Sequence, residues 1–300
     1  MTAAHRLDHH PYLVPPGKSI RLKDFDPAFS EGFKDKSEAR VMLQEDAADL
    51  ATLQNLHWAS KQYAVIVLFQ ALDAAGKDST IKHVMSGVNP QGVRVHSFKA
   101  PNDEERLHHF LWRPTRAAPP RGEIAIFNRS YYEEVLVVRV HPEFLIPQGI
   151  RVSDGRDLKK LWQTRYDDIN AFEETFVRNQ GQIIKFFLNV SREEQKRRFL
   201  ERLEDPEKYW KFSAADLRER ALWDEYQQVY EDMLNATSTA AAPWYVIPAD
   251  RKWFTRACVA DIIASRFEKL DLKFPKLSDS DRAEREEARI TLARELEQED

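Results

Sequence analysis

The sequence predicts an α/β fold in which a doubly wound parallel sheet is flanked by helices on both faces. Continuous apolar runs of strand length recur along the chain and alternate with helical stretches. The first run leads directly into a turn that contains Gly76 and Lys77, and a helical stretch follows. In such a sheet, ligands bind at the carboxyl ends of the strands. The length of 300 residues suits one domain of this kind, or at most two.

The elements can be assigned in order along the chain. Residues 1–36 are rich in Pro, His and charged residues, which favours an extended segment on the surface. Ser37 is expected to cap a helix whose apolar positions, from Val41 to Leu56, approximate one face. Strands are expected at residues 63–69, 93–98, 123–127, 183–190 and 244–247. Further helices are expected at residues 79–86, 103–112, 131–138, 157–179, 192–203, 216–235 and 251–270.

The charge is unevenly distributed. The chain holds 45 Lys and Arg against 49 Asp and Glu, which gives a formal net charge of −4. Residues 276–300 contain nine acids and five bases, so this segment accounts for the whole net charge. We interpret it as an acidic, solvated helical tail that packs between subunits, outside a main domain at residues 37–275. The neutral body has no globally basic surface to attract nucleic acid or a membrane.

Composition excludes several other classes of protein. Hydrophobic residues make up 42% and charged residues 31% of the chain, as in globular rather than disordered proteins. The longest apolar run, residues 64–69, is far shorter than the ~20 residues that a membrane span requires. Residues 1–18 lack the apolar core of a secretory signal. The single cysteine, Cys258, cannot form an internal disulfide, so we expect a cytoplasmic protein.

Residues 70–80, which we name the phosphate loop, are a candidate anion site. Small residues let backbone N–H groups converge on a phosphate, and the helix that follows adds its positive end. Lys77 can then reach the outer phosphates. The match to G-x-x-x-x-G-K-[ST] is imperfect, because Ala71 replaces the first glycine and Asp78 replaces the hydroxyl residue. A tight strand-to-helix connection without a ligand is the alternative. The expected phosphate-binding residues are Ala74, Ala75, Gly76, Lys77, Asp78 and Ser79.

Oxygen ligands for a metal ion follow two of the predicted strands. An acid in a phosphate cradle repels the ligand unless a cation lies between them, so Asp73 is predicted to hold Mg²⁺. We interpret Asp78 as an ordinary acid of the first helical turn, favoured there by the helix dipole. The strand at residues 123–127 ends at Asn128, where a P-loop enzyme places its second metal ligand. Asn128 is a weaker donor, and Glu133 is a supplementary carboxylate.

Two arginines follow the same strand. Arg129 and Arg139 can face transferred phosphates, because a guanidinium group supplies forked donors for phosphate oxygens. A surface ion pair is the alternative for Arg139, and a solvated helix start is the alternative for Glu133.

Residues 192–220 are predicted to form a lid over the phosphates. Arg198 and Arg202 lie one helical turn apart on one face, where they can neutralise charge when the lid closes. Seven basic and six acidic residues lie between Arg192 and Lys211, so ordinary pairing along the helix is the alternative.

With these motifs the chain resembles the family-2 polyphosphate kinases over roughly residues 15–274. The matching segments are residues 72–78 (LDAAGKD), 88–92 (VNPQG), 97–99 (SFK), 127–133 (FNRSYYE), 191–195 (SREEQ) and 242–247 (APWYVI). The resemblance implies a P-loop kinase fold related to thymidylate kinase. It also implies reversible transfer of the terminal phosphoryl group of inorganic polyphosphate to a nucleotide.

The resemblance further implies which residues act. The magnesium carboxylates of the family fall on Asp73 and, with a departure, on Asn128. This departure, with Glu133 after it, resembles the class III branch, which is associated with both nucleoside mono- and diphosphates (AMP and ADP, and by extension GMP and GDP). The family's arginines fall on Arg129, Arg139 and Arg198.

The implied cofactor is Mg²⁺, with Mn²⁺ as a substitute, and the implied partners are polyphosphate and nucleoside mono-, di- and triphosphates. Lys82 and Lys99 are expected to guide the polyanion. A homo-oligomer, either a dimer or a tetramer, is expected. Two rival interpretations are an ATP-dependent P-loop kinase for a small metabolite and a catalytically silent nucleotide-binding protein.

Overall fold

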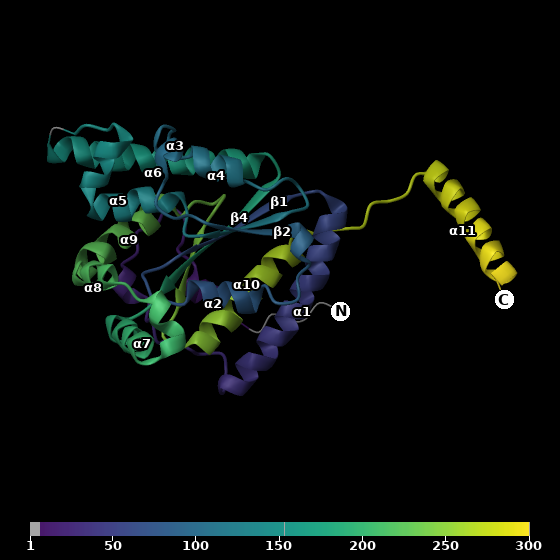
Figure 1. The fold of residues 1–300 in the computed structure, drawn as a ribbon, viewed down its shortest axis with the longest axis horizontal. Coiled ribbons are helices and arrows are strands. Elements are labelled where there is room, and N and C mark those ends of the chain that lie inside the picture. Colours follow the sequence, from purple (N-terminus) through teal and green to yellow (C-terminus); the bar gives the residue numbers. More distant parts are fainter. Residues whose placement is uncertain (1–6, 153, 300) are drawn as a thin grey trace.

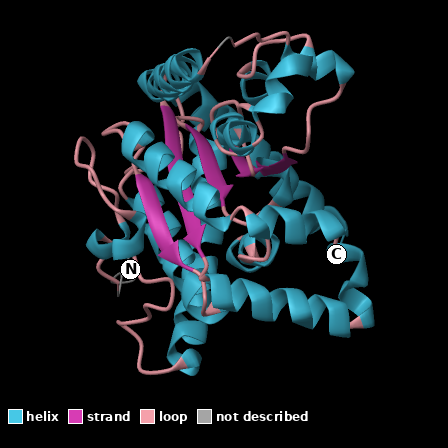
Figure 2. Cartoon of the chain, turned by 90° about the vertical axis from the view of Figure 1, so that its left-hand side faces the viewer, coloured by secondary structure: helices cyan, strands magenta, loops and turns pink. Residues whose placement is uncertain are grey.

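The computed structural model describes residues 7–152 and 154–299, and its centre is a five-stranded parallel sheet between two layers of helices (Figures 1 and 2). The strands are β1 (Ala64–Gln70), β2 (Val93–Ser97), β3 (Ile124–Asn128), β4 (Gly181–Asn189) and β5 (Trp244–Pro248). Their order in the sheet is β2-β3-β1-β4-β5, and every neighbouring pair is parallel. All five predicted strands and the predicted sheet type are confirmed, with strand ends within two residues.

The central strand β1 is buried on both faces because its side chains alternate between two separate cores. Val65 and Val67 pack in one core, and Ile66 and Leu68 pack in the other. The helices of the first core are α1 (Lys36–Ser60), α2 (Lys77–Val84) and α10 (Lys252–Glu268). Those of the second are α5 (Val137–Val140), α6 (Gly155–Arg178) and α9 (Trp223–Thr237). Burial on both sides explains why the apolar run of β1 is continuous.

The sheet brings two chain segments to one point. β1 lies in the middle, and its Phe69 pairs with Asn128 at the end of β3. The chain leaves β1 for the distant β2, returns to β3 beside β1, and then crosses to β4 on the other side. This is the switch point at which open α/β sheets bind their ligands.

Several helices differ from the sequence prediction. α1 is capped by Asp35 rather than Ser37, because the Asp35 carboxylate accepts the N–H groups of Ser37 and Glu38. The helix expected at residues 103–112 is two short helices, α3 (Asp103–Arg106) and α4 (Trp112–Ala117). Pro114 fits only in the first turn of a helix, so α4 begins just before it.

Two more predicted helices are interrupted, and the other four, α2, α6, α7 (Arg192–Glu204) and α10, begin and end within two residues of their predicted bounds. The helix expected at residues 131–138 is a 3-10 helix, Tyr131–Val135, followed by α5. The helix expected at residues 216–235 is α8 (Ala214–Ala221) and α9, separated by Leu222. The 3-10 helix η6 (Pro206–Lys211) follows α7.

The N-terminal segment is irregular, but its described part does not simply rest on the surface. Tyr12, Val14 and Leu22 are buried. The Val14 N–H group donates to the Trp244 carbonyl at 2.9 Å, so the segment lies along the outer edge of β5. Apolar side chains at these positions give the segment a reason to pack inward.

The acidic tail forms a helix, α11 (Asp279–Glu299), which projects away from the body (Figure 1). Its side chains from Asp279 to Leu296 are all exposed. The helical prediction is confirmed, and packing between subunits stays a prediction. Among the described helices, none combines the length and the apolar character needed to traverse a bilayer.

Candidate active site

The phosphate loop leads from the end of β1 into α2, in the order that the sequence predicts. Gly76 has φ +103°, which favours glycine, and Ala74 also adopts a left-handed conformation, with φ +63°. The first-turn N–H groups of α2 have no acceptor within the helix and are available to an anion. Lys77 begins this helix, and its Nζ donates to the Ala71 carbonyl at 2.8 Å.

Lys77 is buried at the floor of this loop. Desolvation, followed by the nearby positive charge of Arg129, lowers the pKa of Lys77 from 10.5 to about 8. An anion bound against the loop would oppose both effects, because it adds further negative charge beside the ammonium group.

The turn after β3 places its polar side chains against the phosphate loop. The Arg129 N–H group donates to the Phe69 carbonyl at 3.1 Å, and Arg129 has φ +61°. Its guanidinium group donates to the Asp73 carboxylate at 2.8 Å and lies 3.6 Å from the Glu133 carboxylate. The charge of Glu133, and then that of Asp73, raises the pKa of Arg129 above its usual range despite burial. Arg129 is therefore held as a cation where the two strands end.

A buried ion pair supports this turn from below. The Lys185 Nζ lies 2.6 Å from the Glu173 carboxylate, and both side chains are fully buried. The same carboxylate accepts the hydroxyl groups of Tyr131 and Tyr132, each at 2.7 Å. These tyrosines follow Arg129 by two and three residues, so the pair fixes the backbone that carries Arg129. Neither Lys185 nor Glu173 was among the site residues predicted from the sequence.

A groove of about 660 Å³ runs from the phosphate loop towards α7, η6 and α10. Nine basic residues line it against three acids, Asp73, Asp78 and Glu201. The basic residues are Lys77, Lys99, Arg129, Arg198, Arg202, Lys208, Lys211, Lys252 and Arg256. We name it the basic groove. It is a local basic site on a chain whose formal net charge is −4.

Four of these basic residues were missed in the sequence. Lys208 and Lys211 belong to η6, and Lys252 and Arg256 lie one turn apart at the start of α10. Lys252 and Arg256 could have been predicted from the sequence, because they follow β5 at the same edge of the sheet as the phosphate loop. The η6 pair had no such signal, because Glu204, Asp205 and Glu207 directly precede these lysines and offer them ordinary ion pairs.

Two smaller cavities adjoin the groove. The first, of about 280 Å³, is lined by Phe98, Phe110 and Phe144, and we name it the phenylalanine cavity. The second, of about 220 Å³, lies beside α9 and is lined by Trp223, Tyr226 and Tyr230. Arg129 lines the groove and both cavities, and Glu133 lines the two cavities. Arg129 thus lies at the junction of an anion site and an apolar pocket.

The predicted metal ligands are only partly brought together. Asp73 and Asn128 line the basic groove, and Asp73 also lines the second cavity together with Glu133, whose carboxylate accepts the Gln70 amide at 2.9 Å. The Asn128 amide nitrogen donates to Asp78 at 2.6 Å, so Asp78 is tied to the end of β3. Among the described residues there is no group of three or more His, Cys, Asp or Glu side chains placed to hold a metal ion.

This donor set still fits Mg²⁺. Mg²⁺ is usually held by one or two carboxylates together with substrate phosphates and waters, rather than by a complete protein cage. Asp73 supplies such a carboxylate inside an anion-binding groove, and the amide oxygen of Asn128 can supplement it.

The remaining predicted residues divide into two groups. Lys99, Ser79 and Arg202 line the basic groove, and Arg202 also lies over the Phe199 ring. Lys82 is exposed on α2 and is not among the lining residues. Arg139 is not among them either, because its guanidinium group donates to Asp232 and to the Tyr166 hydroxyl. The ion-pair alternative therefore describes Arg139 in this structure.

Arg198 also differs from the expectation of a lid arginine that faces phosphate. Its side chain is only 3% exposed, and its N–H groups donate to oxygens of the protein itself. Because Arg198 is buried and bonded in this way, it forms part of the wall of the groove and does not belong to a mobile lid.

Comparison with known proteins agrees with this geometry. The model of the family Polyphosphate kinase 2 (PPK2) matches residues 33–275. A protein of Rhodopseudomonas palustris named ADP-polyphosphate phosphotransferase is 45% identical over 274 residues, which cover 91% of this chain and 94% of that protein. A protein of Meiothermus ruber named AMP/ADP-polyphosphate phosphotransferase is 44% identical over 269 residues, which cover 88% and 95%.

A solved structure is similar over the same extent. The crystal structure of polyphosphate kinase 2 from Arthrobacter aurescens TC1 matches with a TM-score of 0.82 and 37% identity, over 92% of this chain and 94% of that one. The matched segment, residues 33–275, contains the phosphate loop, the turn after β3 and the basic groove. The chain belongs to the polyphosphate kinase 2 family.

Proposed function

We propose that the protein is a polyphosphate:nucleotide phosphotransferase, which moves the terminal phosphoryl group of inorganic polyphosphate to nucleoside mono- and diphosphates and back. The observation that carries this proposal is the junction at Arg129, where the basic groove meets the phenylalanine cavity. Such a junction suits a polyanionic donor on one side and an acceptor with an aromatic base on the other. The names of the two relatives described above support the same pair of substrates.

The donor side is the basic groove. A polyphosphate chain carries negative charge at every phosphate, and its charge is matched by side chains spread along the groove rather than by one pocket. Lys77 and the first-turn N–H groups of α2 would hold the reacting end. Lys208 and Lys252 would hold phosphates further along the chain.

The acceptor side is the phenylalanine cavity. Phe98, Phe110 and Phe144 offer apolar faces to a nucleobase, and Arg113 lines the same cavity. The acceptor phosphate would then lie beside Arg129, opposite the reacting end of the donor. In the transfer, an acceptor phosphate oxygen forms a bond to the terminal phosphorus while the bond to the bridging oxygen breaks.

Catalysis in this arrangement is positioning and charge neutralisation. Mg²⁺, held by Asp73 and Asn128, would neutralise charge on the phosphates of both substrates. Arg129 would stabilise charge on the phosphoryl group in flight, because it is a permanent cation at the junction. Phosphoryl transfer needs little covalent help from a protein, so no side-chain nucleophile is required.

The direct test is to mix the purified protein with long-chain polyphosphate, Mg²⁺, and either ADP or AMP. We expect ATP from ADP, and ADP followed by ATP from AMP, with loss of both products in EDTA. An ATP-dependent metabolite kinase would make neither product from polyphosphate. A silent binding protein would retain nucleotide without turnover. Absence of product with both acceptors would refute the proposal.

The finer assignments are separate parts of the proposal. Use of both AMP and ADP rests on Asn128 and on the name of the Meiothermus ruber relative. Guanine acceptors are expected as well, and competition between AMP and GMP measures the preference. A homo-oligomer is proposed, and light scattering on the eluted protein, with and without α11, would measure its size.

A further inference from the structure

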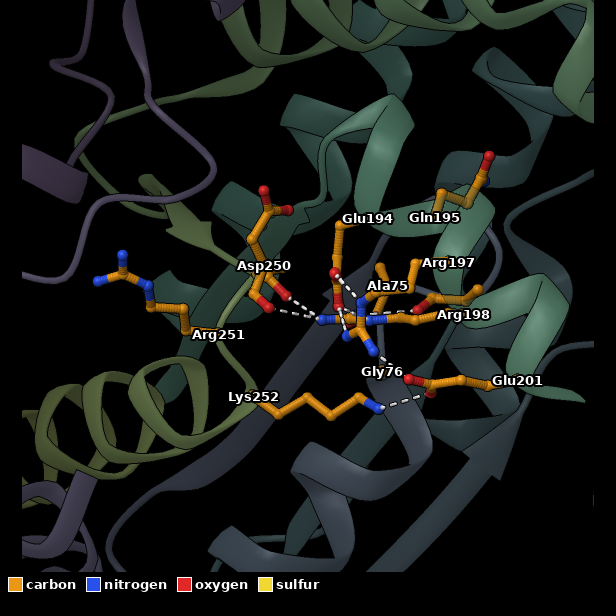
Figure 3. Close-up of polar contacts among 12 residues, drawn as sticks. Ala75, Gly76, Glu194, Gln195, Arg197, Arg198, Glu201, Asp250, Arg251 and Lys252 are labelled. Carbon is orange, nitrogen blue, oxygen red and sulfur yellow. Dashed lines mark hydrogen bonds and ion pairs between the residues drawn. The ribbon is translucent and has the colours of Figure 1, made fainter. Parts of the chain in front are cut away.

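Arg198 lies where three segments of the chain meet, as Figure 3 shows for Ala75, Glu194 and Asp250. Its Nε donates to the Glu194 carboxylate at 2.6 Å. Its Nη1 donates to the carbonyls of Ala74 and Ala75 at 2.9 and 2.8 Å. Its Nη2 donates to the carbonyls of Ala249 and Asp250 at 2.6 and 3.1 Å. A guanidinium group has five N–H donors, and these five bonds use all of them.

Two of these bonds fix the orientation of the phosphate loop. In a trans peptide the carbonyl and the next N–H group point in opposite directions, and no cis peptide bond occurs among the described residues. Because Arg198 holds the Ala75 carbonyl, the N–H group of Gly76 points away from Arg198. Ala74 has a positive φ although it is not glycine, so this turn has a backbone cost that the bonds from Arg198 help to offset.

Other bonds tie α7 to the same place. The Gln195 amide donates to the Asp73 carbonyl at 3.0 Å, and the Gln195 side chain is buried. The Asp250 carboxylate accepts the Ser191 N–H group at 2.8 Å, at the start of α7. α7 is therefore joined both to the phosphate loop and to the turn after β5, which leads into Lys252 on α10.

We propose that Arg198 is a positioning residue that sets the phosphate loop for the polyphosphate donor, and that α7 belongs to the rigid base of the site. A moving lid would then begin after α7, at η6 and α8. This inference rests on the proposed function only for the identity of the donor. Arg198 has no N–H group left to contact a phosphoryl group, so its effect on the reaction passes through the loop.

The test compares Arg198→Lys and Arg198→Ala with Arg197→Ala. Arg197 is the matched control, because it is the neighbouring arginine, is 55% exposed, and pairs with the same Glu194 and with Glu201, both on α7. Lysine keeps the charge of Arg198 but cannot make the five forked bonds. Thermal unfolding identifies any variant that fails to fold. If Arg198→Ala fails to fold, Arg198→Lys can still be compared with Arg197→Ala.

The first readout is hydrogen exchange of the peptides that span residues 71–80, without substrate. We expect faster exchange in both Arg198 variants and unchanged exchange in Arg197→Ala. The second readout is steady-state kinetics with polyphosphate and ADP. We expect kcat/KM for polyphosphate to fall by about 10² in Arg198→Lys, because misplaced binding groups cost about this much. The KM for ADP should stay within about twofold. Added guanidinium should restore part of the activity of Arg198→Ala.

Two results would overturn the inference. One is unchanged loop exchange with a lower kcat and an unaltered KM for polyphosphate, which would make Arg198 a direct charge on the phosphoryl group. The other is an equal loss towards both substrates with no guanidinium rescue, which would make it a general packing residue. If the wild-type protein lacks activity with polyphosphate, the proposed function fails, while the exchange data still decide whether Arg198 holds the loop.

Discussion

Binding of a polyphosphate should be accompanied by proton uptake at Lys77. Burial and Arg129 lower the pKa of this lysine to about 8 in the free protein, against an ordinary value of 10.5. Phosphate in the basic groove adds negative charge beside the ammonium group and should return the pKa towards 10.5. Restoring the full difference is worth about 3.4 kcal/mol, since each pKa unit corresponds to about 1.36 kcal/mol.

The size of the uptake follows from the free-state titration. With a pKa of about 8, Lys77 lacks a proton in about 0.1 of the molecules at pH 7, about 0.5 at pH 8 and about 0.9 at pH 9. Those fractions are the protons that Lys77 should take up on binding. Calorimetry with tripolyphosphate, repeated in buffers of different ionisation enthalpy, measures the total at each pH.

The control is Lys77→Arg, whose guanidinium group stays protonated throughout this range. Subtracting its uptake from that of the wild type removes the phosphate's own protons and isolates Lys77. A difference that stays flat between pH 7 and pH 9 would refute the reasoning. A related expectation concerns stability: because the folded pKa is depressed, the free protein should become more stable as pH rises from about 8 to 10.5.

Three further predictions follow from the site. Arg129→Ala should lower kcat by about 10² or more with both AMP and ADP, because the junction loses its cation; steady-state assays with each acceptor check this, and an unchanged rate with either one would count against it. Asn128→Asp should tighten apparent Mg²⁺ affinity by about tenfold and shift the ratio of AMP to ADP use, because the new carboxylate lies beside Asp78; magnesium titrations of the rate measure it, and identical curves and ratios would contradict it. Lys185→Met should cost about 3–5 kcal/mol of unfolding free energy, since it leaves Glu173 buried without its cation. Urea denaturation of this variant and of Lys185→Met combined with Glu173→Gln tests the last point, and the double variant should recover part of the loss.

The sheet was predictable because a parallel strand that is buried on both faces is a continuous apolar run, which can be recognised without knowing the neighbouring strands. Val65 to Leu68 are apolar without alternation, and that run alone identifies β1 as an interior strand. Helix interruptions were not predictable in the same way. α8 and α9 separate at Leu222, where neither glycine nor proline marks the break. The helical periodicity therefore predicts one continuous helix across it.

The site was predictable where function depends on local sequence. The phosphate loop and the turn at Asn128 and Arg129 are contiguous motifs, and the register of the sheet brings them together. Arg139 and Arg198 were harder, because the role of an arginine depends on which acceptors the fold places near it. Asp232 is distant from Arg139 in the sequence, as Ala74 and Ala249 are from Arg198.

The segment along β5 has a practical consequence for anyone who shortens this chain. An uncovered strand edge offers a row of free N–H and carbonyl groups to any other strand, which is a common start of aggregation. Here Leu13 forms an antiparallel bridge to Tyr245, and Val14 donates to Trp244. A version that starts after Val14 would keep every residue of the basic groove but would leave the outer edge of β5 uncovered. Removing these irregular N-terminal residues is therefore expected to make the protein aggregate and precipitate.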